Sequence, residues 1–212
     1  MASPKPAGEI VYIVDDDAAV SDALGMLMQA EGIHFQTLPS AEAFLEQYRP
    51  GRPSCLILDI GMPGMSGMEL QGRLQSLGYD IPIIFITGHG DIPMAVQAIQ
   101  NGAQDFLQKP FRNEDLLKRI RASFARAHND SSGAKAANQP NQGDAKAIGA
   151  LTGREREVLD CIVEGLSNKA TARKLKISAR TVETHRANLM QKLRVHSVAE
   201  LVKVALAISD PA

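Results

Sequence analysis

Residues 55–67 read CLILDIGMPGMSG, an unbroken apolar run that ends in the carboxylate of Asp59 and a turn rich in Gly and Pro. An apolar run of this length predicts a strand that is buried on both faces, as in a parallel sheet. In such sheets the carboxyl ends of the strands open into the ligand crevice. We therefore place Asp59 at the rim of that crevice, where it serves either as a nucleophile or metal ligand, or only as a cap of the turn through Gly61.

Strand and helix patterns alternate around this stretch. Apolar and β-branched runs predict strands at residues 10–14, 33–37, 55–59, 81–87 and 104–107. Apolar residues at helical spacing predict helices at residues 18–31, 41–48, 67–77, 92–101 and 114–127. Five consecutive strand–helix units predict an α/β fold with an open, doubly wound, five-stranded parallel sheet.

Polar side chains close four of the predicted strands. Asp15 and Asp16 follow the first, Asp59 ends the third, Thr87 ends the fourth and Lys109 follows the fifth. All of them project toward one edge of the sheet, where three close carboxylates repel one another unless a cation such as Mg²⁺ lies among them. The lysine ammonium and the threonine hydroxyl supply the positive charge and the donor that a phosphoryl group requires.

Each of these residues, taken alone, also has a plainer interpretation. Asp15, Asp16 and the following Asp17 could only cap a helix, Thr87 could be a turn residue, and Lys109 could be a solvated loop lysine. Their joint occurrence at matching strand ends favours a site.

The first half of the chain is similar to a known family. Residues 9–127 resemble a response-regulator receiver domain, the flavodoxin-like phosphate acceptor of two-component signalling, and the runs ITGHGD (86–91) and KPF (109–111) resemble FixJ-type regulators. The resemblance implies that Asp59 accepts phosphate from a sensor histidine kinase. The Mg²⁺ ligands that it implies are Asp16, Asp59 and the backbone carbonyl of Gly61, with Asp15 in support.

The resemblance also assigns the phosphate contacts and the switch. Thr87 and Lys109 would bind the phosphoryl oxygens, and the switch aromatic of the family falls on Phe106. Because phenylalanine has no hydroxyl, a hydrogen-bonded form of the switch is impossible in this chain.

Charge and composition divide the chain into two domains and a linker. Residues 1–130 hold 10 Lys and Arg against 16 Asp and Glu (net −6), and residues 131–212 hold 13 against 8 (net +5), which predicts that the second half meets a polyanion. Residues 128–147 carry almost no apolar mass and are interpreted as a linker.

Two isolated cysteines, no signal peptide and no long apolar run predict a soluble, cytoplasmic protein without a membrane partner.

Residues 148–208 predict a small all-α domain with a helix-turn-helix. Thr152 and Glu155 form a capping box for its first helix, residues 168–175 form a second, and Ser178 caps a third whose buried stripe is Val182, Leu189 and Leu193. A helix, a tight turn and a helix lay a recognition helix into the major groove of DNA. The cations around this helix are Lys169, Arg180, Arg186, Lys192 and Arg194.

Geometry separates the DNA contacts into two sets. The base-edge candidates are Glu183, Thr184, Ala187 and Asn188. The phosphate candidates are Lys169, Arg180, Thr181 and Lys192. A helical bundle used only for protein contacts is the alternative. The domain resembles the LuxR/FixJ DNA-binding domain in the motifs LTxRE (151–155), NK (168–169), TVExH (181–185) and KL (192–193). This resemblance implies a fourth helix, residues 197–207, used for dimerisation.

Together these features predict a phosphorylation-switched transcription factor. It would form a homodimer when phosphorylated, bind double-stranded promoter DNA and catalyse only its own phosphorylation and dephosphorylation, with RNA polymerase as a further candidate partner. One alternative is a phosphotransferase of the haloacid-dehalogenase type, whose nucleophile would lie at Asp15-x-Asp17 after the first strand. A second alternative is a receiver that no longer accepts phosphate.

Overall fold

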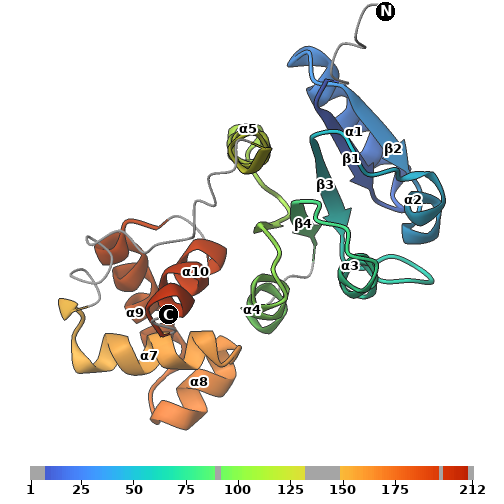
Figure 1. The fold of residues 1–212 in the computed structure, drawn as a ribbon. Coiled ribbons are helices and arrows are strands. Elements are labelled where there is room, and N and C mark those ends of the chain that lie inside the picture. The colour runs from blue at the N-terminus through green and yellow to red at the C-terminus, as the bar shows by residue number, and fades with distance from the viewer. Residues whose placement is uncertain (1–7, 89–91, 132–148, 196–197, 210–212) are drawn as a thin grey trace, which may run out of the picture. The chain divides into compact units, whose positions relative to one another are not determined.

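The computed structural model describes residues 8–88, 92–131, 149–195 and 198–209 (Figure 1). By its internal contacts the chain divides into two units, residues 1–89 with 103–135, and residues 90–102 with 136–212. The first unit contains β1 (Ile10–Val14), α1 (Ala18–Ala30), β2 (Phe35–Leu38), α2 (Ala41–Gln47), β3 (Ser54–Asp59), α3 (Gly67–Ser76), β4 (Ile83–Thr87), β5 (Asp105–Gln108) and α5 (Asn113–Ser131). The second contains α4 (Ile92–Gln100), α7 (Gly153–Val163), α8 (Asn168–Leu175), α9 (Ala179–Leu193) and α10 (Val198–Ser209).

The five strands form one parallel sheet in the order β2-β1-β3-β4-β5. The chain starts in the middle of the sheet, winds outward to β2 and then crosses back to β3, so β1 and β3 are central neighbours. This is the predicted doubly wound, flavodoxin-like arrangement. The order reverses between β1 and β3, the place where such sheets bind their ligands.

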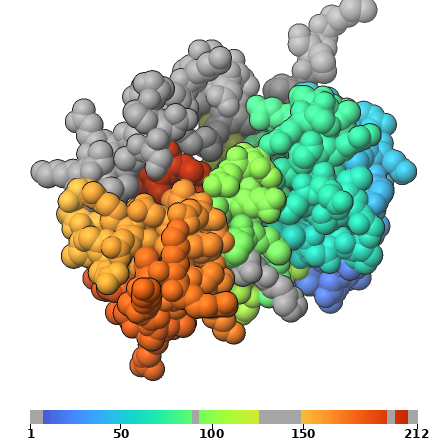
Figure 2. Space-filling view, turned by 90° about the horizontal axis from the view of Figure 1, so that it is seen from below, coloured from blue at the N-terminus to red at the C-terminus, as the bar shows by residue number. Residues whose placement is uncertain are grey.

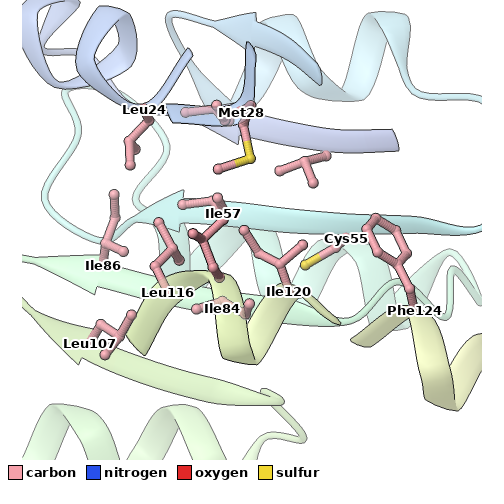
Figure 3. Close-up of a cluster of buried hydrophobic side chains, with 13 residues drawn as sticks. Leu24, Met28, Cys55, Ile57, Ile84, Ile86, Leu107, Leu116, Ile120 and Phe124 are labelled. Atoms are coloured by element: carbon pink, nitrogen blue, oxygen red, sulfur yellow. The ribbon is translucent and has the colours of Figure 1, made fainter. Parts of the chain in front are cut away.

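One face of the sheet is covered by α1 and α5 (Figure 3). Ile57 at the centre of β3 is fully buried there, with Met28 of α1 on one side and Leu116 and Ile120 of α5 on the other. Cys55 lies in the same layer, where burial raises the pKa of its thiol to about 12. The apolar run of β3 is therefore enclosed, as its composition predicts.

The opposite face carries an aromatic group. Tyr12 of β1 meets the rings of Phe44 and Tyr48 edge to face, with centroids 5.4 and 5.5 Å apart, and Phe44 stacks on Tyr48 at 5.0 Å. Tyr79, which follows α3, meets Tyr48 at 5.4 Å. These spacings suit favourable ring contacts, so the group fastens α2 and the end of α3 to the sheet.

The second unit is a set of short helices around an apolar centre. Val158 of α7, Val182 and Leu189 of α9 and Leu201 of α10 are fully buried. Residues 92–100 follow β4 in the chain, yet α4 packs against α10 and α7 and so groups with these helices. Figure 2 shows the atoms of α7 and α8, coloured orange, packed closely against one another.

Element boundaries differ from the prediction in a few places. The second strand begins at Phe35 because the amide of Ile33 donates to the Met28 carbonyl (2.9 Å), within the turn that ends α1 at Gly32. The fourth strand begins at Ile83, and α5 extends to Ser131. Linker residues 132–147 lie outside the described residues. No helix in the described part of the chain is long and apolar enough to cross a bilayer.

Candidate phosphoacceptor site and DNA-binding face

The strand register brings the polar strand ends together. Val14 pairs with Leu58, so Asp15 and Asp59, the next residues along, lie side by side at the carboxyl edge of the two central strands. Asp59 pairs with Ile86 in β4, and Thr87 pairs with Gln108, next to Lys109. This edge is the rim that the strand-end pattern predicts.

Lys109 joins the two carboxylates. Its Nζ donates to Asp15 Oδ2 at 2.7 Å and to Asp59 Oδ1 at 2.9 Å. The side chain of Asp15 is 1% exposed and that of Asp59 is 11% exposed, while Lys109 reaches them from the surface with 23% of its side chain exposed. The Lys109–Pro110 peptide is cis.

The pKa values of this group reflect both burial and pairing. Burial raises the pKa of the Asp15 carboxyl, and hydrogen bonds from Lys109 and the Asp17 amide offset only part of that effect. Burial alone would lower the pKa of Lys109, but the hydrogen bonds and charges of Asp15 and Asp59 together raise it. The ammonium is therefore held charged between two acids.

The turn after β3 fixes the other oxygen of Asp59. The amide of Gly61 donates to Asp59 Oδ2 at 2.7 Å, so the turn-capping role of Asp59 is present together with its contact to Lys109. At the start of α3, Gly67 lies so close to β3 that a Cβ on it would be 2.2 Å from the Asp59 carbonyl oxygen. Glycine is needed here because the backbones approach so closely.

A residue that the sequence analysis missed also holds this turn. Glu42, at the start of α2, accepts the amide of Met65 at 3.0 Å, and hydrogen bonds from its own amide, from Ser40 and from Met65 lower the pKa of its carboxyl. In the sequence, Glu42 resembles any acid in the first turn of a helix. Only the tertiary contact distinguishes it.

The other predicted residues of the receiver site differ in burial. Thr87 ends β4 and is buried, and Phe106 in β5 is also buried. Asp16 is exposed beside the buried Asp15, while Asp17 caps α1 by accepting the Ala19 amide. No group of three or more His, Cys, Asp or Glu side chains in the described ranges is arranged as a metal site. The structure thus unites Asp15, Asp59 and Lys109.

The rim has the parts needed to accept a phosphoryl group. Asp59 offers a carboxylate oxygen at the surface end of a rigid strand, and Lys109 supplies a positive charge next to it. Oxygen donors and a cation at a partly buried edge suit phosphoryl oxygens and a hard divalent ion.

The second unit contains a helix-turn-helix formed by α8 and α9. Ser167 caps α8 by accepting the Ala170 amide, and Ser178 caps α9 by accepting the Thr181 amide. Between them Lys176 adopts a left-handed conformation (φ 55°), which makes the tight turn. The cap of α9 lies at the predicted residue, Ser178.

The faces of α9 divide as the apolar spacing predicts. Val182, Leu189 and Leu193 are buried. The predicted base-edge residues are all exposed: Glu183, Thr184, Ala187 and Asn188. The recognition helix therefore presents short and polar side chains outward, of a size that fits the major groove.

The predicted phosphate contacts fall into two kinds. Lys169 and Arg180 are exposed, and neither side chain is paired with any residue in the described part of the chain. By contrast, Lys192 donates to the buried Glu155 at 2.7 Å. Thr181 shares a hydrogen bond of 2.8 Å with the cap residue Ser178.

Comparison with known proteins agrees with this arrangement. Residues 11–121 match the response regulator receiver domain family, and residues 149–205 match the bacterial regulatory proteins of the luxR family. The chain is 46% identical over 202 residues to the response regulator protein TmoT of Ectopseudomonas mendocina (95% of this chain and 90% of TmoT). It is 43% identical to the transcriptional regulatory protein FixJ of Azorhizobium caulinodans (92% and 91%).

A solved structure extends the likeness to three dimensions. The response regulator StyR superimposes with a TM-score of 0.57 at 42% identity, covering 94% of this chain and 99% of StyR. Both domains are thus matched in sequence and in fold, and the match is to regulators with a DNA-binding domain and not to catalytic enzymes. The chain belongs to the two-component response regulators of the FixJ type, which join a receiver domain to a LuxR-type DNA-binding domain.

Proposed function

We propose that a sensor histidine kinase transfers a phosphoryl group to Asp59, and that this promotes homodimerisation and sequence-specific binding of promoter DNA. The observation that carries the proposal is the ammonium of Lys109, which donates to both Asp15 and Asp59 at the carboxyl edge of the sheet. A charged donor already placed beside the acceptor oxygen can stabilise the charge of the transferred group after only a small shift.

In the proposed reaction a carboxylate oxygen of Asp59 attacks phosphorus. The new O–P bond forms as the bond from phosphorus to the donor nitrogen breaks, and the electron pair of that bond stays with the histidine ring. Lys109 and the hydroxyl of Thr87 then donate to the phosphoryl oxygens. The modification adds about −1.5 to −2 charge at Asp59.

Receiver domains characteristically bind Mg²⁺ at this place, and the residues present suit that ion. The proposed ligands are Asp15, Asp16, Asp59 and the Gly61 carbonyl, all of them hard oxygen donors. The ammonium of Lys109 already balances two of these acids. When bound, the ion would neutralise charge on the phosphoryl oxygens.

The output of the proposed switch is the DNA-binding domain. Thr87 would move toward the phosphoryl group and Phe106 would follow by packing alone, because it has no hydroxyl to bond. The resulting change on α4 and β5 would favour the dimer, and two recognition helices would then meet half-sites about one helical turn apart. Lys169, Arg180 and Thr181 are the proposed phosphate contacts, and RNA polymerase is a further proposed partner.

A gel-shift experiment tests the proposal directly. The full chain is mixed with DNA from upstream of its own gene and its neighbours, with and without acetyl phosphate or beryllofluoride. We expect the shift to strengthen with either reagent in the wild type and in Asp80→Asn, a control carboxylate on the exposed surface. Asp59→Asn should lose that response. If Asp59→Asn still responded to the phosphate donor, the proposal would be wrong.

A further inference from the structure

Two cations of the DNA-binding domain are paired with residues of neighbouring helices. Lys192 Nζ donates to Glu155 Oε2 at 2.7 Å, and Arg186 Nη1 donates to Asn168 Oδ1 at 2.8 Å. Both belong to the recognition helix α9, and their partners belong to α7 and α8. We propose that Lys192 and Arg186 are positioning residues that hold α9 at the angle needed to read DNA bases, and are not DNA phosphate ligands. The inference rests on the proposed DNA binding and deepens it.

Glu155 is the centre of the first contact. Its Oε2 accepts the amide of Thr152 at 2.8 Å, the Thr152 hydroxyl at 2.9 Å and the ammonium of Lys192. The side chain of Glu155 is only 5% exposed, against 40% for Lys192. A DNA phosphate would compete with this enclosed carboxylate for the ammonium, and a weaker contact to Glu155 would leave a buried charge less well compensated, which is unfavourable. The contact therefore ties the end of α9 to the start of α7.

Arg186 makes the second contact from the middle of α9. Its side chain is only partly exposed, and burial lowers the pKa of its guanidinium. Its Nε is enclosed and meets no hydrogen-bond acceptor among the described residues. Asn168, its partner, is the first residue of α8. The guanidinium thus spans the two helices of the helix-turn-helix and does not project toward solvent.

Other cations nearby behave in the opposite way. The side chains of Lys169 and Arg180 are exposed, and within the described ranges no hydrogen bond or ion pair restrains them. They can meet a phosphate without breaking an internal contact. The cations around α9 thus include Lys169 and Arg180, which would set affinity, and the paired Lys192 and Arg186, which would set the orientation of α9.

The pose of α9 matters because base contacts tolerate little error. Residues 183–188 carry the proposed base-edge side chains, and hydrogen bonds weaken steeply once distance and angle leave a narrow range. Residues 186 and 192 fasten the helix within and beyond that segment. Removing either contact should spoil base recognition and leave the attraction to the phosphate backbone unchanged.

Salt dependence separates the two roles. The full chain, activated with beryllofluoride, is titrated against a duplex selected by the wild type from a random pool and against an unselected duplex, over a series of salt concentrations. For Lys192→Met and Arg186→Met we expect roughly tenfold weaker binding of the selected duplex. Binding of the unselected duplex and the slope of log K against log salt should stay as in the wild type.

Arg180→Ala is the matched control. It should weaken binding to both duplexes and reduce the salt slope by about two, because each subunit of the homodimer loses one phosphate contact. If Lys192→Met or Arg186→Met behaved in this way, the inference would be overturned. An equal loss on both duplexes with an unchanged slope, together with a lower melting temperature, would also overturn it, because it would indicate only a smaller folded fraction.

Glu155→Gln weakens the contact between Lys192 and Glu155 by changing the acceptor instead of the cation. Its amide oxygen can still accept from Thr152, but the charge that holds Lys192 is gone. We expect Glu155→Gln to lose affinity for the selected duplex as Lys192→Met does. Lys192→Arg, made in the otherwise wild-type chain, keeps the positive charge and should retain most of that affinity. If Lys192 were a phosphate ligand, Glu155→Gln would free it and strengthen binding to both duplexes. Absence of any DNA binding by the wild type would contradict the proposed function itself, and with it the inference.

Discussion

The receiver rim and the recognition helix use charged residues in contrasting ways. At the rim, two acids and a lysine from three different strand ends turn toward one another. The ammonium of Lys109 lies within 3 Å of a carboxylate oxygen of Asp15 and of Asp59, so the opposite charges partly neutralise one another. On α9 the cations divide: the side chain of Arg180 is exposed without a partner among the described residues, whereas Lys192 is paired with Glu155. A charged residue at the end of a parallel strand has its neighbours dictated by the sheet, whereas one on a helix surface can take either role.

The largest effect should follow from removing the rim cation. Lys109→Met should slow phosphate incorporation from acetyl phosphate roughly 10²- to 10³-fold, the loss typical of one charged donor. It should also tighten Mg²⁺ binding, because two carboxylates lose their internal cation. Labelling kinetics and calorimetric Mg²⁺ titration measure the two effects. Lys118→Met, an exposed lysine of α5, should change neither. Weaker Mg²⁺ binding in Lys109→Met would show that the ammonium does not compete for these acids.

A second prediction concerns how tightly the rim is built. Gly67→Ala places a Cβ 2.2 Å from the Asp59 carbonyl oxygen and should destabilise the receiver by roughly 1–3 kcal/mol. Gly72 lies in the interior of the same helix, and apart from the backbone of that helix no atom lies within 4 Å of a Cβ added there. Gly72→Ala should therefore stabilise the receiver by about 0.5–1 kcal/mol. Urea unfolding of both variants gives the comparison. Equal effects would mean that the close approach is relieved without strain.

The third prediction uses pH to probe the contact between Lys192 and Glu155. Pairing with Lys192, followed by the Thr152 amide, lowers the pKa of Glu155 from 4.5 to about 2. A lowered folded-state pKa contributes stability that is present above pH 4.5 and is lost as pH falls toward 2. The melting temperature of the DNA-binding domain should therefore fall as pH is lowered through this window, and Glu155→Gln should flatten that dependence. A wild-type profile as flat as that of the variant would argue against the pairing.

The smallest expected effect is the loss of a helix cap. Ser178 accepts the Thr181 amide at 3.0 Å at the start of α9, so Ser178→Ala should cost about 1 kcal/mol of stability. Thr184→Ala is the control, because among the described residues its hydroxyl bonds only to the Arg180 carbonyl of its own helix. Thermal melts of both variants provide the measurement. If the melting temperature of Ser178→Ala were no lower than that of Thr184→Ala, the Ser178 cap would not contribute to the stability of α9.

Local patterns predicted most of the fold and the frame of the receiver site. Apolar runs alternating with helices predicted five strands in a parallel sheet, and the pairing of Val14 with Leu58 in that sheet brings Asp15 and Asp59 side by side. Caps such as Ser178 were predictable because the cap and the amide that it accepts lie within three residues of each other. Each of these features depends on short-range sequence or on a general rule of sheet topology.

Contacts between distant residues were not predictable. Lys192 and Glu155 are 37 positions apart, so the sequence gives no sign that this lysine is already engaged. Glu42 and Met65 are 23 apart. The packing of α4 with α7 and α10 depends on side-chain fit between segments that no local pattern links.

The aromatic group of the receiver gives the molecule a built-in optical reporter. The chain has no Trp, and its three Tyr are those of this group, while every Phe precedes residue 125. Near-ultraviolet absorption and intrinsic emission therefore arise from the receiver alone. Tyrosine emission will follow unfolding of that domain without labels, while far-ultraviolet circular dichroism follows the helices of both. The two melting transitions of one unmodified chain can thus be resolved in a single sample.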